Sequence, residues 1–380
     1  MDFSLSEEMR MLSDMAYKFA QVEFESVSQE CDEEEKYTPE IRKKAAENGL
    51  VGAWIPEEYG GAGVGNLGNT IITEQVSRVD MGIGLNIVAS SFGCENLVLF
   101  GSEEQKKEYL PAICAGDTVS AGAYTEPNAG TDVAGYRTRA VKDGDDYVIT
   151  GNKMFITNGT VCDWMVVQAV TQPEEKAHKS FSQIIVPADA PGITRTKIKG
   201  KMGIRASDTA EIALEEVRVP QSNLIGKEGA GFYQLMHFFD TTRIMVAGQG
   251  IGLAQACLDE SVKYCKERTV FGKPLGSYQL TMKKLTEMWI KIESLRILTY
   301  KAAALADEGH PDYHLSAMAK FHSGDTAVFC ANAAVEIHGG YGYIDEYKVQ
   351  KWYRDAKILE LYEGTKEAEI MTLGRVLMSK

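Results

Sequence analysis

The stretch Tyr147-Val148-Ile149-Thr150-Gly151-Asn152-Lys153-Met154-Phe155-Ile156-Thr157 decides the fold, because it places two short β-prone runs inside a chain whose two ends have helical patterns. β-Branched and aromatic residues favour strands. Gly-Asn between two such runs is typical of a tight hairpin turn. We therefore predict a hairpin here, within a β-rich block whose other strands are expected at 164–170, 182–186 and 211–214.

On both sides of this block, apolar residues recur at three- and four-residue steps, the pattern of helices with one buried face. The helices are predicted at about 7–22, 39–49, 67–79, 84–99, 102–116, 229–266, 277–308, 312–338 and 366–378. Four long helices in succession indicate a bundle. The predicted fold class is multidomain α+β, with an N-terminal α-helical domain (1–117), a middle antiparallel β-barrel or sandwich domain (118–226) and a C-terminal four-helix bundle (227–380).

The composition argues against several classes of function. The chain has 380 residues and a formal net charge of −14, which disfavours nucleic acid or an anionic membrane as the main partner. Its seven cysteines form no CxxC pair and its six histidines no metal-ligand spacing, so we expect reduced thiols, no metal site and a cytoplasmic protein. The acidic N-terminus predicts no secretory signal, and no stretch reaches the length of a membrane-spanning helix.

A carboxylate near the C-terminus is the candidate catalytic group. In Tyr362-Glu363-Gly364-Thr365 it stands on a turn between two apolar segments. A base that removes a weakly acidic C–H proton works best when partial burial raises its pKa toward working pH. Gly364 permits a tight turn, and Thr365 can cap the helix that follows. Read by itself, the stretch also fits an ordinary helix corner with a solvated glutamate.

Four other segments are rich in turns and polar groups: 122–132, 155–159, 268–274 and 336–342. The first could form a loop around the polar edge of a ring, and the second offers an aromatic side chain for stacking and a hydroxyl group. The third offers a cation for a diphosphate, and the fourth a backbone that a phosphate can approach. Each also fits an ordinary loop or helix end. Gly248-Gln249-Gly250-Ile251-Gly252 is not a dinucleotide fingerprint, because no strand precedes it, so we interpret its glycines as sites of close helix packing.

Taken in order, these motifs resemble the acyl-CoA dehydrogenase family over essentially the whole chain. The segments that carry the resemblance are 124–132, 154–159, 239–243, 268–272, 338–342 and 362–365. The resemblance implies a helical, a β and a four-helix-bundle domain in this order, FAD as the cofactor and an acyl-CoA as the substrate. It also implies an electron-transfer flavoprotein as the partner and a homotetramer built as a dimer of dimers.

By the same resemblance, Glu363 is the catalytic base that removes the α-proton of the thioester while the β-hydrogen leaves as hydride to flavin N5. Its backbone N–H and a flavin ribityl hydroxyl would hold the thioester oxygen. The residues expected to contact FAD are Tyr124, Thr125, Phe155, Ile156, Thr157, Arg268, Phe271, Gln279, Glu336, Gly339, Gly340, Thr365 and Glu367. Of these, Arg268 and Phe271 would reach the FAD of a neighbouring subunit, and Gly339, Gly340 and Thr365 would border that same FAD. The residues expected to contact the substrate are Ser91, Thr131, Asp240, Arg243, Tyr362 and Gly364.

Three residues depart from the family pattern. Glu336 and Glu367 stand where many relatives have glutamine, and would repel a diphosphate unless they face away or pair with cations such as Arg268 or Lys366. Thr242 is not acidic, whereas some relatives carry their base on that helix, so the role of base falls on Glu363.

The acyl group and the direction of reaction stay open at this point. The segment at about 84–100 is expected to line the acyl pocket, with Ser90, Ser91, Phe92 and Cys94 as candidates. Ile83 and Gly84 stand where glutaryl-CoA relatives have an arginine, which disfavours a dicarboxylic substrate and leaves short to medium, branched or alicyclic chains. The alternatives are an enoyl-CoA reductase running in reverse, an acyl-CoA oxidase or flavin hydroxylase, and a non-enzymatic binding protein.

Overall fold

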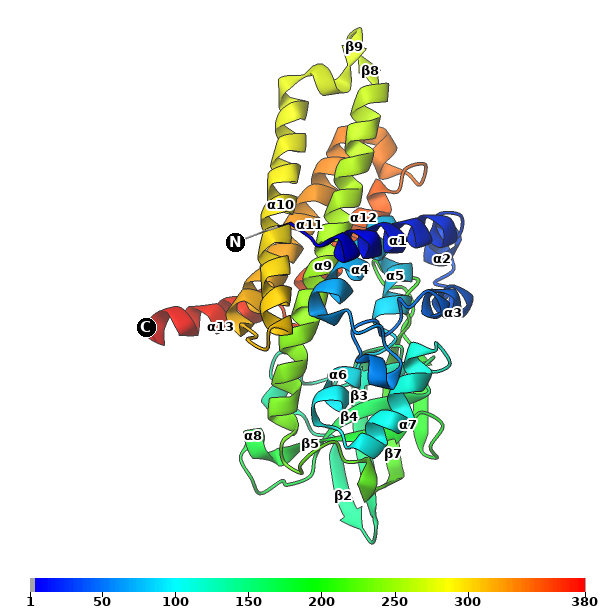
Figure 1. Ribbon diagram of the computed structural model, residues 1–380, viewed down its shortest axis with the longest axis vertical. Helices are drawn as coiled ribbons and strands as arrows, with labels where there is room; N and C mark the ends of the chain where they lie inside the picture. Colours follow the sequence, from blue (N-terminus) through cyan, green and yellow to red (C-terminus); the bar gives the residue numbers. More distant parts are fainter. Residues whose placement is uncertain (1–3, 380) are drawn as a thin grey trace.

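The N-terminal part of the chain is helical, as predicted. The computed structural model describes residues 4–379, and its ribbon is shown in Figure 1. The helices of this part are α1 (Glu7–Phe24), α2 (Ser28–Glu33), α3 (Pro39–Glu47), α4 (Gly65–Val79), α5 (Met81–Val88), α6 (Cys94–Phe100) and α7 (Glu103–Cys114). The Ser102 side chain and Gln105 close a capping box that starts α7.

The predicted single helix at 84–99 is wrong, because the chain breaks between α5 and α6. Gly93, just before α6, has a left-handed φ of +97°. A Cβ added there would lie 2.9 Å from Cγ2 of Val166 in the sheet. The segment passes too close to the β domain for a helix to continue, and only glycine allows that approach.

A single seven-stranded sheet forms the middle of the chain. Its strands are β1 (Ser120–Ala123), β2 (Arg139–Asp143), β3 (Asp146–Thr157), β4 (Trp164–Val170), β5 (Phe181–Pro187), β6 (Ile193–Lys197) and β7 (Thr209–Pro220). The strand order is β1-β4-β2-β3-β7-β6, with β5 also paired to β4. Most neighbours are antiparallel, as predicted, but β1 and β2 each run parallel to β4.

The predicted Gly-Asn hairpin is wrong. Residues 147–157 lie in the single strand β3, which pairs along its length with β7 and has register shifts at Ile149/Gly151 and Lys153/Ile156. The hairpin turn lies earlier, between β2 and β3, where Gly144 has a φ of +61°. Gly151 is needed for a different reason, since an added Cβ would lie 2.4 Å from the Thr138 hydroxyl oxygen.

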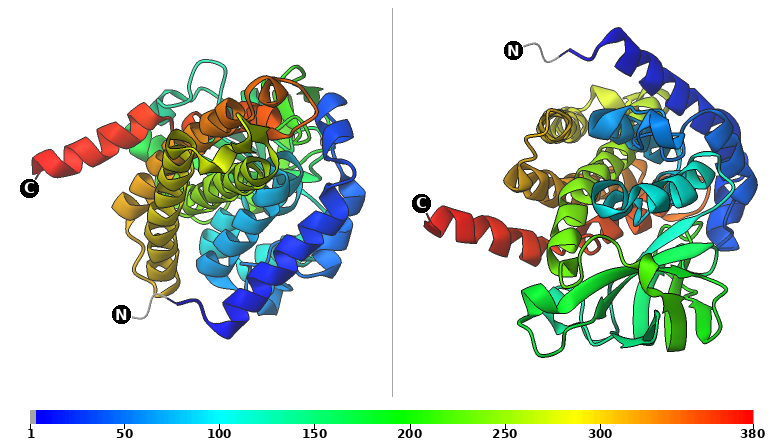
Figure 2. Two further views of the ribbon diagram at one scale, coloured as in Figure 1. Left: turned by 90° about the horizontal axis from the view of Figure 1, so that it is seen from above. Right: turned by 60° about the horizontal axis from the view of Figure 1, so that its bottom comes forward.

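The C-terminal part contains the four predicted long helices. They are α9 (Gly231–Glu267), α10 (Gln279–Asp307), α11 (Tyr313–His338) and α13 (Lys366–Ser379). α9 runs from the β domain at one end of the molecule to the small hairpin of β8 (Thr269–Val270) and β9 (Lys273–Pro274) at the other, and α10 returns beside it (Figure 1). The shorter helices are α8 (Ala177–Ser180) and α12 (Val349–Ala356), and α13 projects from the body (Figure 2). No helix within residues 4–379 combines the length and apolar character needed to cross a membrane.

Glycines let α9 pack closely against its neighbours, as interpreted from the sequence. An added Cβ at Gly252 would lie 2.1 Å from the Glu74 carbonyl oxygen of α4, and one at Gly250 would lie 2.7 Å from Cβ of Ser323 in α11. The glycine run therefore serves helix packing and not phosphate binding. The boundaries at 117/118 and 226/227 stay predictions.

A buried lysine connects the three parts of the chain. Lys351 Nζ on α12 lies 3.0 Å from Asp80 Oδ2, at the start of α5, and 2.7 Å from Asp355 Oδ2. Asp80 also accepts the Ser28 hydroxyl at 2.5 Å, and Asp355 accepts the backbone N–H of Ile204, from the loop between β6 and β7, at 2.6 Å. The charge of one lysine thus compensates two carboxylates, one that contacts the N-terminal helices and one that contacts the sheet region.

Replacing Lys351 with methionine is expected to lower the free energy of unfolding by roughly 3–5 kcal/mol, because two buried carboxylates lose their counter-ion. The matched control is Lys36→Met, which removes a surface pair of 2.6 Å to Glu30 whose side chains are about half exposed. The control is expected to leave the free energy of unfolding nearly unchanged, because solvent screens an exposed ion pair. Thermal unfolding followed by circular dichroism compares the two, and equal midpoints would contradict the proposed importance of this network.

Candidate active site

The turn that carries Glu363 connects α12 to α13. After α12, a 3-10 turn (Lys357–Glu360) buries Leu359 and leads into Glu363, whose φ of +52° is left-handed. The Tyr362 hydroxyl hydrogen bonds to Oε1 of Gln249 on α9. The Thr365 hydroxyl accepts the backbone N–H of Ala368 at 3.3 Å and caps α13, as predicted. Left-handed backbone at a residue other than glycine, aspartate or asparagine is uncommon, which marks this turn as strained.

The Glu363 carboxylate is half-buried against α9. Its Oε2 accepts the Thr242 hydroxyl at 2.7 Å, and Nε of Arg243 lies 3.5 Å from its backbone carbonyl oxygen. Burial raises the pKa of Glu363, while the Thr242 hydrogen bond and the charges of Arg243 and Lys320 act in the opposite direction. Thr242, noted from the sequence only for lacking a carboxylate, therefore holds the candidate base in place.

Glycine is required after Glu363 for steric reasons. Gly364 has a φ of +103°, and an added Cβ would lie 2.2 Å from Oε1 of Glu369. Glu369 lies in the first turn of α13, is fully buried, and forms an ion pair of 3.0 Å with Nε of Arg243. Lys320 of α11, also fully buried, donates to the Gly364 carbonyl.

The β domain brings Thr125, Phe155 and Thr157 to one place. The backbone N–H of Met154 donates to the Thr125 carbonyl at 2.9 Å, so this loop lies against β3. Phe155 is 65% exposed and Thr157 half-buried, whereas Ile156 between them is in the core, as expected for neighbours on opposite faces of a strand. Of the predicted cofactor contacts, Ile156 therefore directs its side chain away from this face.

Lys153 and the ring of Tyr124 support this loop from inside. The fully buried Lys153 donates to the carbonyls of Tyr124 and Gln168 at 3.0 and 2.7 Å and to the Glu126 carboxylate at 2.9 Å. Burial lowers the pKa of Lys153 to about 8. The Tyr124 ring is in the core, 5.0 Å from that of Phe238 on α9, so only the backbone of Tyr124 faces the loop.

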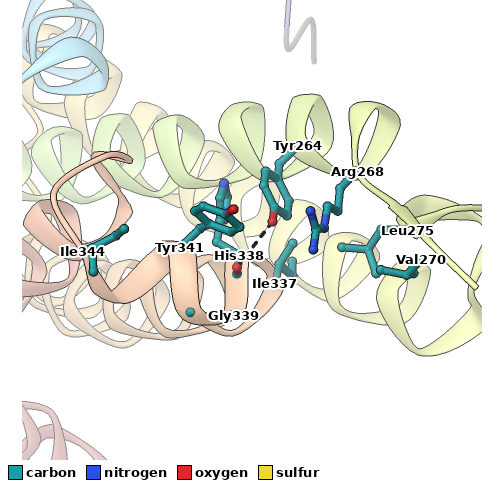
Figure 3. A pocket seen from close by; sticks show the side chains of 10 residues that line it. Tyr264, Arg268, Val270, Leu275, Ile337, His338, Gly339, Tyr341 and Ile344 are labelled. Atoms are coloured by element: carbon teal, nitrogen blue, oxygen red, sulfur yellow. Dashed lines mark hydrogen bonds between the residues drawn. The ribbon is translucent and has the colours of Figure 1, made fainter.

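A second set of predicted residues lies at the far end of α9 and α10. Arg268, Gly339 and Gly340 line a cavity of about 490 Å³ together with Tyr264, His338 and Tyr341 (Figure 3). The Arg268 guanidinium lies 5.7 Å from the centre of the Tyr341 ring. Phe271 is 97% exposed in the β8–β9 hairpin, and Gln279 is exposed at the start of α10. Within one chain, this set lies at the opposite end of α9 from the β domain (Figure 1).

Glu336 is paired with a cation, one of the two conditions stated from the sequence, but the cation is neither of the two named as examples. Glu336 forms an ion pair with Lys284 of α10 and accepts Nδ2 of Asn332 at 3.0 Å, not Arg268 or Lys366. Lys366 instead pairs with Asp325 and Glu360. Glu336 is thus neutralised by a neighbouring helix, and Glu367 is exposed at the first turn of α13.

The predicted substrate contacts are less uniform. Ser91 is fully buried and accepts Nε1 of Trp54 at 3.3 Å, Asp240 is half-buried on α9, and Thr131 is exposed. Glu95 of α6 was missed. Burial raises its pKa to about 8, and the charge of Glu363 contributes in the same direction. Burial thus favours the neutral form of Glu95, while the backbone N–H of Gly93, which donates to its Oε2 at 2.9 Å, favours the charged form.

Among the groups that the sequence did not indicate, Lys320 had a visible signal and Glu369 had none. Lys320 is the one charged residue in the run Ala317-Met318-Ala319-Lys320 of α11, where small residues indicate close packing. An acid in the first turn of a helix, like Glu369, is usually solvated. Its burial depends on how α13 meets α9 and α11. No group of three or more histidine, cysteine or acidic residues in the described part of the chain could hold a metal ion.

Comparison with known proteins matches the whole chain to one family. Models of the N-terminal, middle and C-terminal domains of acyl-CoA dehydrogenases match residues 6–117, 121–217 and 229–378. The chain is 41% identical to the acryloyl-CoA reductase (NADH) of Anaerotignum propionicum, covering 100% of this chain and 97% of that one. The chain belongs to the acyl-CoA dehydrogenase family.

Two solved structures have the same fold over their full length. The butyryl-CoA dehydrogenase of Megasphaera elsdenii superimposes with a TM-score of 0.96 at 37% identity, with 100% of both chains covered. A chain from the structural work on the electron transferring flavoprotein of Acidaminococcus fermentans, directed at flavin-based electron bifurcation, superimposes with a TM-score of 0.97 at 40% identity, again over 100% of both chains. Acyl-CoA dehydrogenases are FAD-dependent oxidoreductases that act on CH–CH bonds.

The residues of this member of the family fit an FAD. Phe155 and Phe271 are apolar rings left 65% and 97% exposed on left-handed backbone, as needed for rings that lie against a ligand. At Gly339 and Gly340 an added Cβ would meet nothing within 4 Å, so the backbone there is open to a ligand. Nε2 of the buried His338, on the wall of the same cavity, has no hydrogen-bond partner among the described residues.

Gly364→Ala is expected to lower kcat by about 10²-fold, because the new methyl group collides with Glu369 and displaces the turn that carries Glu363. The control is Gly309→Ala, a position with a φ of +75° at which an added Cβ meets nothing within 4 Å. Its cost is limited to about 1–2 kcal/mol of backbone strain, with kcat unchanged. Steady-state kinetics with an acyl-CoA compares both variants, and an unchanged kcat in Gly364→Ala would contradict the steric argument.

Proposed function

We propose that the protein catalyses the α,β-dehydrogenation of an acyl-CoA thioester with Glu363 as the base. The observation that carries the proposal is the environment of this carboxylate: half-buried, hydrogen bonded by Thr242 at 2.7 Å and faced by the cations Arg243 and Lys320. Burial makes the group a stronger base, while the two cations keep it available in its ionised form.

In the reaction, the ionised Glu363 carboxylate takes the α-proton of the thioester and becomes the neutral acid. The backbone N–H of Glu363 finds no acceptor among the described residues, so it is free to donate to the thioester oxygen as charge develops there. Thr242 and the Gly364 turn hold both groups toward the substrate. When bound, FAD supplies the two-electron acceptor for the β-hydrogen.

We propose a shared FAD site and a homotetramer. Thr125, Phe155 and Thr157 would contact the flavin half. Arg268, Phe271 and Gln279 would contact the diphosphate and adenine of an FAD in a neighbouring subunit, and Gly339, Gly340 and Thr365 would border that FAD. The distance between the two sets along α9 supports a site completed by a second copy. Trp289, Ile290 and Ile297 on α10 are 57–59% exposed, which supports a subunit contact along that helix.

We propose a short-chain acyl-CoA as the substrate, with an electron-transfer flavoprotein as the electron acceptor. The support is the similarity to butyryl-CoA dehydrogenase and to the chain from work on an electron transferring flavoprotein. The reverse reduction of an enoyl-CoA is the second candidate, because the acryloyl-CoA reductase is 41% identical over the full chain. The same base, returning its proton to the α-carbon, serves this direction.

Glu363→Gln is expected to keep acyl-CoA and FAD binding but to lower turnover by about 10²–10⁴-fold, since an amide cannot accept the α-proton. The control is the surface variant Glu308→Gln. Anaerobic mixing with butyryl-CoA, followed by the loss of flavin absorbance, measures the step directly. Bleaching at the wild-type rate in Glu363→Gln would exclude this residue as the base.

Arg268→Gln is expected to weaken FAD binding by about 10- to 100-fold, because the variant loses one charge-assisted hydrogen bond to the diphosphate. Lys266→Gln, an exposed change of the same charge two residues earlier, is the control. FAD content after dialysis and FAD titration of the apoprotein give the comparison. Equal affinities in the two variants would remove Arg268 from the cofactor site.

A further inference from the structure

A buried lysine contacts the turn that presents the candidate base. Lys320 lies in the middle of α11, is 0% exposed, and donates its ammonium group to the carbonyl of Gly364. A lysine is almost never fully buried unless its charge is compensated. Because the acceptor is the residue next to Glu363, the position of this ammonium group is tied to the position of the base.

The compensating charge comes from Glu369. It is fully buried in the first turn of α13, beside Gly364, and its carboxylate pairs with Arg243 at 3.0 Å. Neither Glu369 oxygen is in a well-aligned hydrogen bond with any of the described residues. Its negative charge therefore acts on both cations by proximity, and it also lowers the cost of burying Lys320.

Two cations favour the ionised form of Glu363, Arg243 from α9 and Lys320 from α11. The acidic groups around them are Asp240 from α9, Glu360 from the 3-10 turn, Glu369 from α13 and Glu95 from α6. Arg243 also pairs with Glu369 at 3.0 Å, whereas the ammonium group of Lys320 donates to the turn itself. Loss of the Lys320 charge therefore removes one of the two cations that oppose the effect of burial on Glu363.

We propose that Lys320, supported by Glu369, is a positioning residue for this reaction: it fixes the left-handed turn through the Gly364 carbonyl and supplies the positive charge that keeps Glu363 ionised beside the substrate. The inference rests on the proposed role of Glu363 as the base. It adds that α11 and α13, which provide no group in contact with the reacting carbons, set the strength of that base.

The expected pH dependence follows from these charges. Burial lowers the pKa of Lys320 to about 8, against the opposing effect of Glu369 and Glu363. Burial raises the pKa of Glu363. Activity therefore rises with pH as the Glu363 carboxyl group loses its proton. It then falls above pH ~8 as Lys320 loses its proton and the site gains net negative charge.

Three variants test this. Lys320→Met is expected to lower kcat about 10- to 100-fold with little change in KM, to move the acid limb of kcat to higher pH and to remove the alkaline limb. Lys320→Arg keeps the charge, so its alkaline limb moves to higher pH. Glu369→Gln removes the counter-charge, so its alkaline limb moves to lower pH. Lys283→Met, an exposed change on α10, is the control.

The measurements are kcat and KM across pH, with FAD content and thermal midpoint recorded for each variant. If Lys320→Met loses FAD or fails to fold, the other two variants test the proposal. The alkaline limb is expected to move to higher pH in Lys320→Arg and to lower pH in Glu369→Gln, and equal or absent shifts would overturn the proposal. A folded Lys320→Met with the kcat and the pH profile of the wild type would also overturn the proposal for Lys320. The proposed function would still stand in that case if Glu363→Gln loses turnover. Turnover retained in Glu363→Gln would refute the function itself.

Discussion

The structure depends on one buried ion network, in which Lys351 lies between Asp80 and Asp355. Asp80 starts α5 of the helical domain and accepts Ser28 of α2, and Asp355 receives the backbone of Ile204 from the β domain. Two buried carboxylates without a cation would be strongly destabilising, so the observed arrangement of the three parts of the chain depends on Lys351. Because α12 carries Lys351 and leads directly into the Glu363 turn, the same network sets where the base emerges.

Charge is arranged around Glu363 so that two opposite requirements are met. A base needs burial to raise its pKa, but burial alone would leave it protonated and inactive. The charges of Arg243 and Lys320 oppose that effect. The uncharged hydroxyl of Thr242 orients the carboxylate by a hydrogen bond. The turn is left-handed at Glu363 and at Gly364. Three helices hold it: Lys320 of α11 donates to the Gly364 carbonyl, Gln249 of α9 accepts the Tyr362 hydroxyl, and Glu369 of α13 lies against Gly364.

Long periodic segments were predicted well, and short or interrupted ones were not. The four long C-terminal helices and β4 lie within a few residues of their predicted bounds, because their apolar patterns extend over many turns or a whole strand. The Gly-Asn hairpin and the helix at 84–99 failed for a common reason. Gly151 and Gly93 are present because another segment comes within 3 Å of where a side chain would be, and local sequence does not record such an approach.

The sequence by itself determined the class of fold, the family, and the grouping of Thr125, Phe155 and Thr157, since these depend on local patterns and on motif order along the chain. Only the tertiary structure decided which charges meet. It paired Lys284 with Glu336, 52 positions later in the chain, and it placed Lys320 against the carbonyl of Gly364, 44 positions later. It also buried Glu369 beside Gly364. Electrostatic energy depends on distance and burial, and both are properties of the packed helices and not of any one of them.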